Sequence, residues 1–471
     1  MTVKYEVLLK HGWVVDPASG LDGLADVAIA GGRIVEIGPD LDPTCATEVL
    51  DVARRHVVPG IIDLHTHVSE WLGGRLGHKM MARVGVTTAL DMARPVDGVL
   101  RSLRDYGTGL NIACIEGIRP GVNVRNNNPD RAELETMLAH ALRGGAIGLK
   151  IRGGHMPLTP EATARAIAVA NAHQAYAGIH AGTTERGSNI DGFLQAVELA
   201  AGHALHIAHL NNYCRGAIRP LIQEAEEAIA ALIAHPNIRS ESYLSLLNGT
   251  SAKCANGAPE SLLARECLTL GGFPPTEAGF EAAIQAGWAQ INMEAAGEMV
   301  LGTGRSAVEY WRARATDTPV SFQVHPPEPP FRLAVARRPG GQFAVDCIST
   351  DAGGGIPRNV IVEMGLCLVG LQAITIADFV RKTSTNPARV LGLRNKGHLS
   401  VGADADITVL DVPRHRALLS LSNGKMVMYR GHVVGRGGQM ITTAAGEAAV
   451  RAAGLTPLVV SLADSGFYRG V

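Results

Sequence analysis

The stretch Val57-Val58-Pro59-Gly60-Ile61-Ile62-Asp63-Leu64-His65-Thr66-His67 decides the fold, because a strongly apolar run ends in two histidines there. β-branched residues around a Pro-Gly breaker are the pattern of a buried strand. Side chains alternate along a strand, so His65 and His67 project from one face, and Asp63 shares that face. A strand with incidental histidines would show the same letters. Two imidazoles on one face nevertheless supply half of a transition-metal site, which is the prediction for this strand end.

The string P-G-I-I-D-L-H-T-H at residues 59–67 resembles the signature of the amidohydrolase superfamily. In that family the two histidines close the first strand of a (β/α)8 barrel and bind a divalent metal. The resemblance therefore implies a metal-dependent hydrolase. It also implies that a lysine, two more histidines and an aspartate follow in that order.

Length and charge limit the function classes. The 471 residues exceed the roughly 250 of a plain barrel, so we expect a second, smaller domain. A formal charge of −1 argues against nucleic acid or a membrane surface as partner, which leaves a small-molecule substrate. No apolar run approaches the roughly 20 residues of a membrane span, and the first residues lack a signal-peptide pattern. We therefore expect a cytoplasmic enzyme, and a homo-oligomer.

The seven cysteines are an odd number and form no C-x-x-C pair. This usage predicts reduced thiols rather than a disulfide framework. Cys214 lies shortly after a candidate ligand histidine, but no general base for a catalytic thiol is identifiable beside it.

Short alternating strands separated by glycine appear near both ends of the chain. They occupy much of residues 8–52 and return at 404–411 and 425–434. We therefore predict one small β-sandwich formed from residues 1–55 and 395–440, with the barrel at 56–394 between them and a tail at 441–471. The family resemblance implies the same composite architecture.

Between the two β regions, apolar strands alternate with helical stretches, which is typical of a parallel barrel. One strand, Ala146-Ile147-Gly148-Leu149-Lys150-Ile151, carries a lysine in an apolar run. Burying that charge is costly unless it is paired or removed. Pairing with a carboxylate or snorkelling to solvent would resolve the cost. In binuclear members of the resembled family, such a lysine is carboxylated by CO2 and bridges two metals.

The remaining candidate ligands also end strands. His180 closes the strand Ala177-Gly178-Ile179-His180. The residue numbers of His206 and His209 differ by an odd number, so on a regular strand only one of the two side chains can face the barrel interior. His209 is nearer the carboxyl end, where barrel enzymes keep their chemistry, and His206 is assigned to the core. The resemblance makes Asp351, in Ser349-Thr350-Asp351, a metal ligand and proton shuttle. Two divalent metals, with zinc expected, would then be held by His65, His67, Lys150, His180, His209 and Asp351.

The segment between His209 and Asp351 is too long for the remaining barrel elements. Apolar spacing typical of helices within it predicts a helical insertion around residues 250–340. The insertion could serve as a lid or as an oligomer contact.

A binuclear centre of this kind would generate a hydroxide near neutral pH and polarise a carbonyl, so the expected reaction is amide hydrolysis. Asp351 would be the catalytic residue, taking the proton and returning it to the leaving nitrogen. Arg152 and Arg358 could bind a substrate carboxylate, or could be solvated surface arginines.

The substrate class stays open between two branches of the resembled family. Lys150 is similar to the lysine of dihydroorotases and hydantoinases, which open cyclic amides. Other runs resemble D-aminoacylases, which cleave N-acyl amino acids but use a cysteine near the second strand, where this chain has Asp91-Met92. A deaminase is disfavoured because no glutamate follows His180 within three residues. A non-catalytic, hydantoinase-like scaffold would be expected to have lost ligands that this chain retains.

Overall fold

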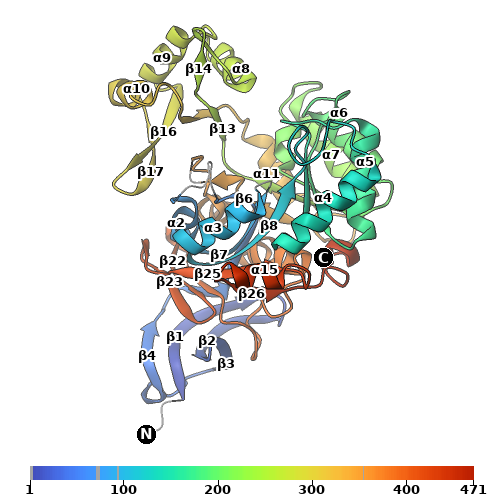
Figure 1. The fold of residues 1–471 in the computed structure, drawn as a ribbon. Coiled ribbons are helices and arrows are strands. Elements are labelled where there is room, and N and C mark those ends of the chain that lie inside the picture. Colours follow the sequence, from blue (N-terminus) through green and yellow to red (C-terminus); the bar gives the residue numbers. More distant parts are fainter. Residues whose placement is uncertain (1–3, 70–74, 93–94, 354) are drawn as a thin grey trace.

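The computed structural model describes residues 4–69, 75–92, 95–353 and 355–471. A central barrel lies between a β domain, which holds the N-terminus, and an insertion on the opposite side (Figure 1). The C-terminus lies beside the barrel (Figure 1). Among the helices of the described residues, none combines the length and apolar character needed to cross a bilayer.

Parallel strands close into the expected (β/α)8 barrel, which confirms the predicted fold class. The last strand is interrupted at Thr350-Asp351: its first half pairs with β12 and its second half with β6, which closes the circle. The strands are β6 (Ile61–His67), β7 (Val86–Met92), β8 (Thr108–Gly117), β9 (Gly148–Arg152), β10 (Tyr176–His180), β11 (Leu205–Ile207), β12 (Ile238–Tyr243), β19 (Cys347–Ser349) and β20 (Ala352–Gly353).

Helices follow the strands and cover the barrel: α2 (Gly77–Arg83), α3 (Val96–Tyr106), α4 (Arg131–Gly144), α5 (Pro160–Ala172), α6 (Ile190–Ala200), α7 (Leu221–Ala234), α11 (Glu328–Val335), α12 (Ile361–Gly370), α13 (Ile376–Val380) and α14 (Asn386–Val390). Local sequence sets their ends. In α4, Asp130 and Glu133 form a capping box, and Gly145 ends the helix in the left-handed conformation. Leu134, Leu138 and Ala141 share the face that packs on the strands.

The β domain combines both ends of the chain, as predicted. It contains β1 (Tyr5–Asp16), β2 (Leu21–Ala30), β3 (Arg33–Gly38), β4 (Ala46–Asp51), β5 (His56–Pro59), β21 (Ile407–Asp411), β22 (Arg416–Ser422), β23 (Lys425–Tyr429) and β24 (His432–Val433). β5 joins the two halves, because it pairs with β1 on one side and with β21 on the other. The strands thus form one continuous sheet around a shared core that includes Val14, Val27, Ile407 and Leu421.

Gly60 lets the chain pass directly from β5 in this domain into β6 of the barrel. A Cβ at Gly60 would lie 2.3 Å from Thr87 Oγ1, so no larger residue fits without a shift. Its amide donates to Asp406 O at 2.7 Å. The site-bearing strand is therefore anchored at its base by both domains.

The insertion differs from the expected helical segment, because it also contains a sheet. Strands β13 (Leu247–Ser251), β18 (Pro319–Gln323), β16 (Ala289–Ala295) and β17 (Glu298–Gly302) pair in that order, and β14 (Cys254–Ala255) forms a ribbon with β15 (Ala258–Pro259). Helices α8 (Leu262–Leu270), α9 (Glu277–Gln285) and α10 (Gly304–Arg312) pack around Phe280, Trp311 and Phe322. β13 pairs with a strand nearly 70 residues away, so no local window of sequence reveals the sheet.

The C-terminal residues expected to form a tail belong to the barrel instead. β25 (Gly437–Thr442) pairs with the first half of β8, and β26 (Thr456–Val459) extends it. Helices α15 (Glu447–Ala452) and α16 (Gly466–Arg469) complete the segment. Phe467 is fully buried and stacks on Tyr176 of β10, with ring centroids 4.4 Å apart. This contact explains why the last residues are ordered against the fold.

Phe467→Ala should therefore destabilise the protein by about 3–5 kcal/mol, because it removes a fully buried ring. Denaturant unfolding would measure the loss. Val459→Ala, at an exposed position of the same segment, is the matched control and should change stability by less than about 0.5 kcal/mol. Equal stability of the two variants would contradict the packing role of the C-terminal segment.

Candidate metal centre

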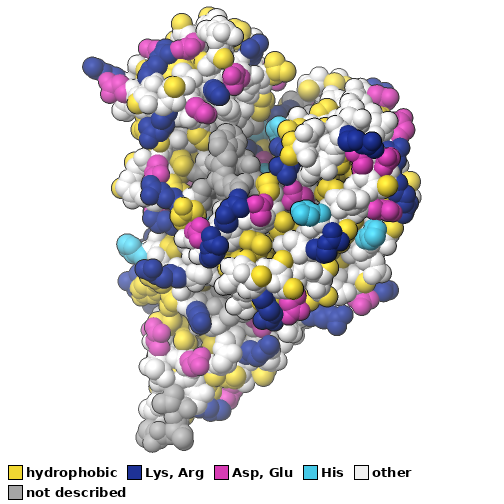
Figure 2. All heavy atoms as spheres, viewed as in Figure 1, with side chains coloured by type: hydrophobic (Ala, Val, Ile, Leu, Met, Phe, Trp, Pro, Cys, Tyr) yellow, Lys and Arg dark blue, Asp and Glu magenta, His cyan; other side chains and the backbone are white. Residues whose placement is uncertain are grey.

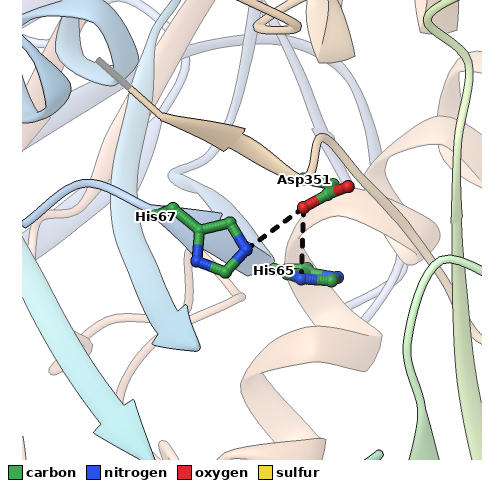
Figure 3. A group of neighbouring side chains, drawn as sticks. All are labelled: His65, His67 and Asp351. Carbon is green, nitrogen blue, oxygen red and sulfur yellow. Dashed lines mark ion pairs between the residues drawn. The ribbon is translucent and has the colours of Figure 1, made fainter. Parts of the chain in front are cut away.

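His65, His67 and Asp351 meet at the carboxyl end of the barrel (Figure 3). Asp351 Oδ1 lies 3.3 Å from His65 Nε2 and 3.2 Å from His67 Nε2. Ligands of a tetrahedral metal at about 2.0–2.1 Å are separated by about 3.3 Å, so these atoms are spaced as ligands of one ion would be.

His180 and His209 form a second pair beside the first. His209 Nε2 lies 3.0 Å from His180 Nδ1, and the rings of His65 and His209 have centroids 5.1 Å apart. The other nitrogen of His180 contacts Ser188 Oγ at 2.7 Å, which leaves Nδ1 directed at the cluster. The structure thus brings together all five of the histidine and aspartate ligands predicted from the sequence.

Burial keeps these imidazoles neutral. It lowers the pKa of His65, His180 and His209 well below the usual imidazole range, and neighbouring positive groups lower it further. A neutral imidazole has a free lone pair, which metal ligation requires. The nitrogen-rich donor set with one carboxylate is the set that zinc prefers.

Lys150 lies in β9 and is 3% exposed. Its Nζ is 2.9 Å from Met92 Sδ, and no carboxylate of the described residues lies within ion-pair distance of it. Burial lowers the pKa of Lys150 to about 7, against the opposing attraction of Glu241 and Asp351. A Cβ at Gly178 would lie 2.8 Å from Ile115 Cδ1 and 3.4 Å from Lys150 Cδ, so the glycine makes room chiefly for Ile115 beside the lysine. The lysine is thus neither solvated nor conventionally paired.

Glu241 on β12 is a site residue that the sequence analysis missed. This fully buried carboxylate accepts hydrogen bonds from His65 Nδ1 at 2.7 Å, from the His209 backbone amide and from Ser349 Oγ. A carboxylate behind a ligand histidine fixes its tautomer and ring orientation. One signal for this residue was present in the sequence. Glu241 lies within the strand Ile238–Tyr243, and a carboxylate buried there needs several hydrogen-bond donors.

A second buried carboxylate, Asp63, fixes the turn that presents Asp351. It accepts from His65 N at 3.0 Å and from Thr350 Oγ1 at 2.7 Å. Burial raises the pKa of Asp63 to about 7, although these hydrogen bonds oppose the rise. Asp351 and His209 have φ values of 51° and 37°, which are costly for residues other than glycine. The surrounding hydrogen bonds hold this strained backbone in place.

The two predicted substrate arginines differ in position. Arg358 is 4% exposed, donates from Nη1 to Asp351 Oδ2 at 2.6 Å and lies over the Tyr243 ring at 5.1 Å. Burial opposes ionisation of Asp351, but Arg358 and His65 outweigh it and hold the pKa of Asp351 well below its usual range. Arg152 is half-buried at the end of β9, where Nη1 lies 3.5 Å from Met156 Sδ.

His206 and Cys214 lie outside the cluster. Tyr176 Oη lies 2.6 Å from His206 Nδ1, and burial lowers the pKa of His206 to about 3, so it is a core histidine as predicted. His209 follows the end of β11 and is turned inward by its backbone rather than by strand alternation. Burial raises the pKa of the Cys214 thiol, which argues against a nucleophilic role.

Comparison with known proteins finds relatives among amidohydrolases. The profile of the amidohydrolase family matches residues 340–436. A dihydroorotase of Pelotomaculum thermopropionicum is 28% identical over 442 residues, covering 86% of this chain and 89% of the relative. An N-acyl-D-glutamate deacylase of Alcaligenes xylosoxydans xylosoxydans is 24% identical over 476 residues, covering 87% and 88%.

Solved structures share the fold. N-acyl-D-glutamate deacylase from Bordetella bronchiseptica, complexed with zinc and a phosphonate inhibitor, matches with a TM-score of 0.66 at 17% identity, covering 93% of this chain and 99% of that one. A D-hydantoinase from Thermus sp. matches with a TM-score of 0.59 at 17% identity, covering 92% and 98%.

Glu241→Gln should weaken zinc binding by about 10- to 100-fold, because an amide cannot accept from all three donors and no longer fixes His65. Competition with a chromogenic chelator would measure the affinity. Glu135→Gln on the surface of α4 is the control and should leave it unchanged. A loss of less than about threefold in Glu241→Gln would mean that His65 is oriented by other contacts.

Proposed function

We propose that this chain, which belongs to the amidohydrolase superfamily, hydrolyses a carbon–nitrogen bond of a small-molecule amide at a divalent metal centre. The observation that carries the proposal is the convergence of four imidazoles, Asp351 and buried Lys150 at one end of the barrel. Superfamily members of this type act on carbon–nitrogen bonds other than peptide bonds. The retained ligand set argues against a non-catalytic scaffold.

We assign His65, His67 and Asp351 to one metal and His180 with His209 to a second. The spacing of the donor atoms supports this division, as does Lys150, which has no carboxylate of the described residues within ion-pair distance. A carbamate on Lys150 would bridge the two ions. When bound, such metals lower the pKa of water and polarise an amide carbonyl.

The chain's own residues would carry the proton. Asp351 takes it on a carboxylate oxygen and returns it to the leaving nitrogen. Arg358 holds Asp351 Oδ2 in a fixed direction and keeps the carboxylate ionised before the reaction. Glu241 holds the ring of His65 in place. Neither the metal ligand His65 nor the proton acceptor Asp351 then has to reorganise during the reaction.

Within this reaction class we propose a cyclic amide or ureide as substrate. Lys150 resembles the lysine of ring-opening members of the family, and Met92, rather than a cysteine, contacts it. The dihydroorotase similarity supports the same choice.

An N-acyl amino acid is the second candidate, and Arg358 is the observation that favours it. This buried guanidinium lies beside Asp351, where it could bind a substrate carboxylate. Arg152 lies at the carboxyl end of β9. The similarity to N-acyl-D-glutamate deacylases supports this candidate.

A substrate panel tests the choice. The zinc-loaded enzyme would be assayed on hydantoin, dihydropyrimidine and dihydroorotate, and on N-acyl derivatives of D- and L-amino acids. We expect the highest kcat/KM on a ring compound. A higher kcat/KM on an N-acyl amino acid would favour the second candidate, and no hydrolysis of either class would contradict the proposal.

Lys150→Ala should lose most of one zinc equivalent together with activity, because the bridge between the metals is removed. Zinc content by plasma mass spectrometry measures the first effect. Added propionate, whose carboxylate fits the vacated space, should restore part of the activity. Lys253→Ala, at a half-exposed lysine of the insertion, is the control. Two tightly bound zinc ions in Lys150→Ala would show that no bridge is required.

Asp351→Asn should keep the fold and at least one zinc ion but lower kcat by about 10²- to 10⁴-fold, because an amide cannot accept and return a proton. The measurement is turnover of the zinc-loaded variant, with exposed Asp464→Asn as control. A loss below about tenfold, or about 1.4 kcal/mol in barrier, would assign the proton to another group.

A further inference from the structure

A second cavity lies outside the metal centre, where four parts of the chain meet. Its volume is about 390 Å³, and its walls come from α2, from the start of β17, from the segment after Asp351 and from β22 with the β23–β24 turn. We call it the seam pocket. Figure 2 shows Lys and Arg side chains along this flank of the molecule.

The seam pocket has an excess of positive charge. Arg83, Arg416 and Arg430 line it together with one carboxylate, Glu298. Arg83 Nη1 pairs with Glu298 Oε2 at 2.7 Å, so these two charges offset each other. Two guanidinium groups remain on the β-domain side of the pocket.

Those two guanidinium groups have unused donors. Arg416 Nε is 3.8 Å from Asp411 Oδ2, but the same oxygen also contacts Arg414 at 3.2 Å. Arg430 lies over the ring of Tyr429 at 5.2 Å and has no ion pair within the described part of the chain. A guanidinium offers five N–H donors, so both can still bind an anion.

The geometry points to the seam pocket as a binding site for a small organic anion that carries phosphate or carboxylate groups. Arg416 and Arg430 would hold the anionic groups, and Met80 and Met299 provide apolar wall for the rest of the molecule. The volume is in the range of small-ligand sites. This site is separate from the amide-hydrolysing centre and does not depend on the function proposed for it.

An occupant would touch both the insertion and the segment next to the metal centre. Glu298 and Met299 begin β17 of the insertion, and Glu298 also pairs with Lys79 of α2 at 3.1 Å. Pro357 and Asn359 flank Arg358, the partner of Asp351. The pocket therefore joins the insertion, the β domain and the segment that holds Arg358.

The test is calorimetric titration of the zinc-loaded protein with inorganic phosphate and, separately, with glutarate, at ionic strength matched with KCl. The double variant Arg416→Ala, Arg430→Ala removes the two free cations. The matched control, Arg131→Ala with Arg305→Ala, removes two exposed arginines from remote helices, each of which has a glutamate partner four residues away.

Saturable binding of either probe to the wild type and the control, weakened at least about tenfold in the double variant, is the expected result. Phosphate bound only at the metal centre would persist unchanged in the double variant. Such persistence within threefold, or the lack of saturable binding of both probes to the wild type, would overturn the inference. Phosphate binding without glutarate binding, or the reverse, would identify the anionic group that the pocket takes.

Discussion

The buried carboxylate of Glu241 is the interaction on which the site depends. It connects His65 on β6, the backbone of His209 after β11, and Ser349 on β19 to its own strand, β12. A carboxylate in the barrel interior is costly unless several donors compensate it. Those donors come from separate strands. The negative charge of Glu241 is therefore compensated only when the strands pair as they do in this closed barrel. The same contacts orient the candidate metal ligands.

Other parts of the molecule hold the barrel strands in this arrangement. Gly60 anchors β6 to the β domain, and Phe467 packs under β10 beside Tyr176. At the opposite rim, Asp63 and Thr350 hold the strained turn of Asp351. The rigid base and the hydrogen-bonded rim together allow residues with positive φ to point at one centre, an arrangement common at functional sites.

Local sequence signals predicted the barrel and the meeting of four histidines and an aspartate at its carboxyl end. His65, His67, His180 and Asp351 each end an apolar strand, and strand ends on one rim of a parallel barrel converge, so their meeting could be predicted without the structure. His209 lies in the cluster, where a left-handed backbone rather than strand alternation turns it inward, and its role as a metal ligand stays a prediction. The carbamate on Lys150 stays a prediction.

The features that the sequence analysis missed depend on distant contacts. Glu241 was missed because its donors lie as far as 176 residues away in the chain, so their number is not visible around the glutamate itself. The sheet of the insertion pairs β13 with β18 across three helices, and β25 near the C-terminus pairs with β8, more than 300 residues earlier in the chain. A pairing between distant strands produces no periodic hydrophobic pattern in a local window of sequence. Each helix between the strands does produce one.

Anomalous diffraction at the zinc edge, on crystals of the zinc-loaded protein, tests the central claim most directly. The account predicts two peaks at the carboxyl end of the barrel, one among His65, His67 and Asp351 and the other beside His180 and His209, with density for a carbamate on Lys150 between them. Loss of every peak from this cluster, with zinc bound elsewhere or not at all, would contradict the account.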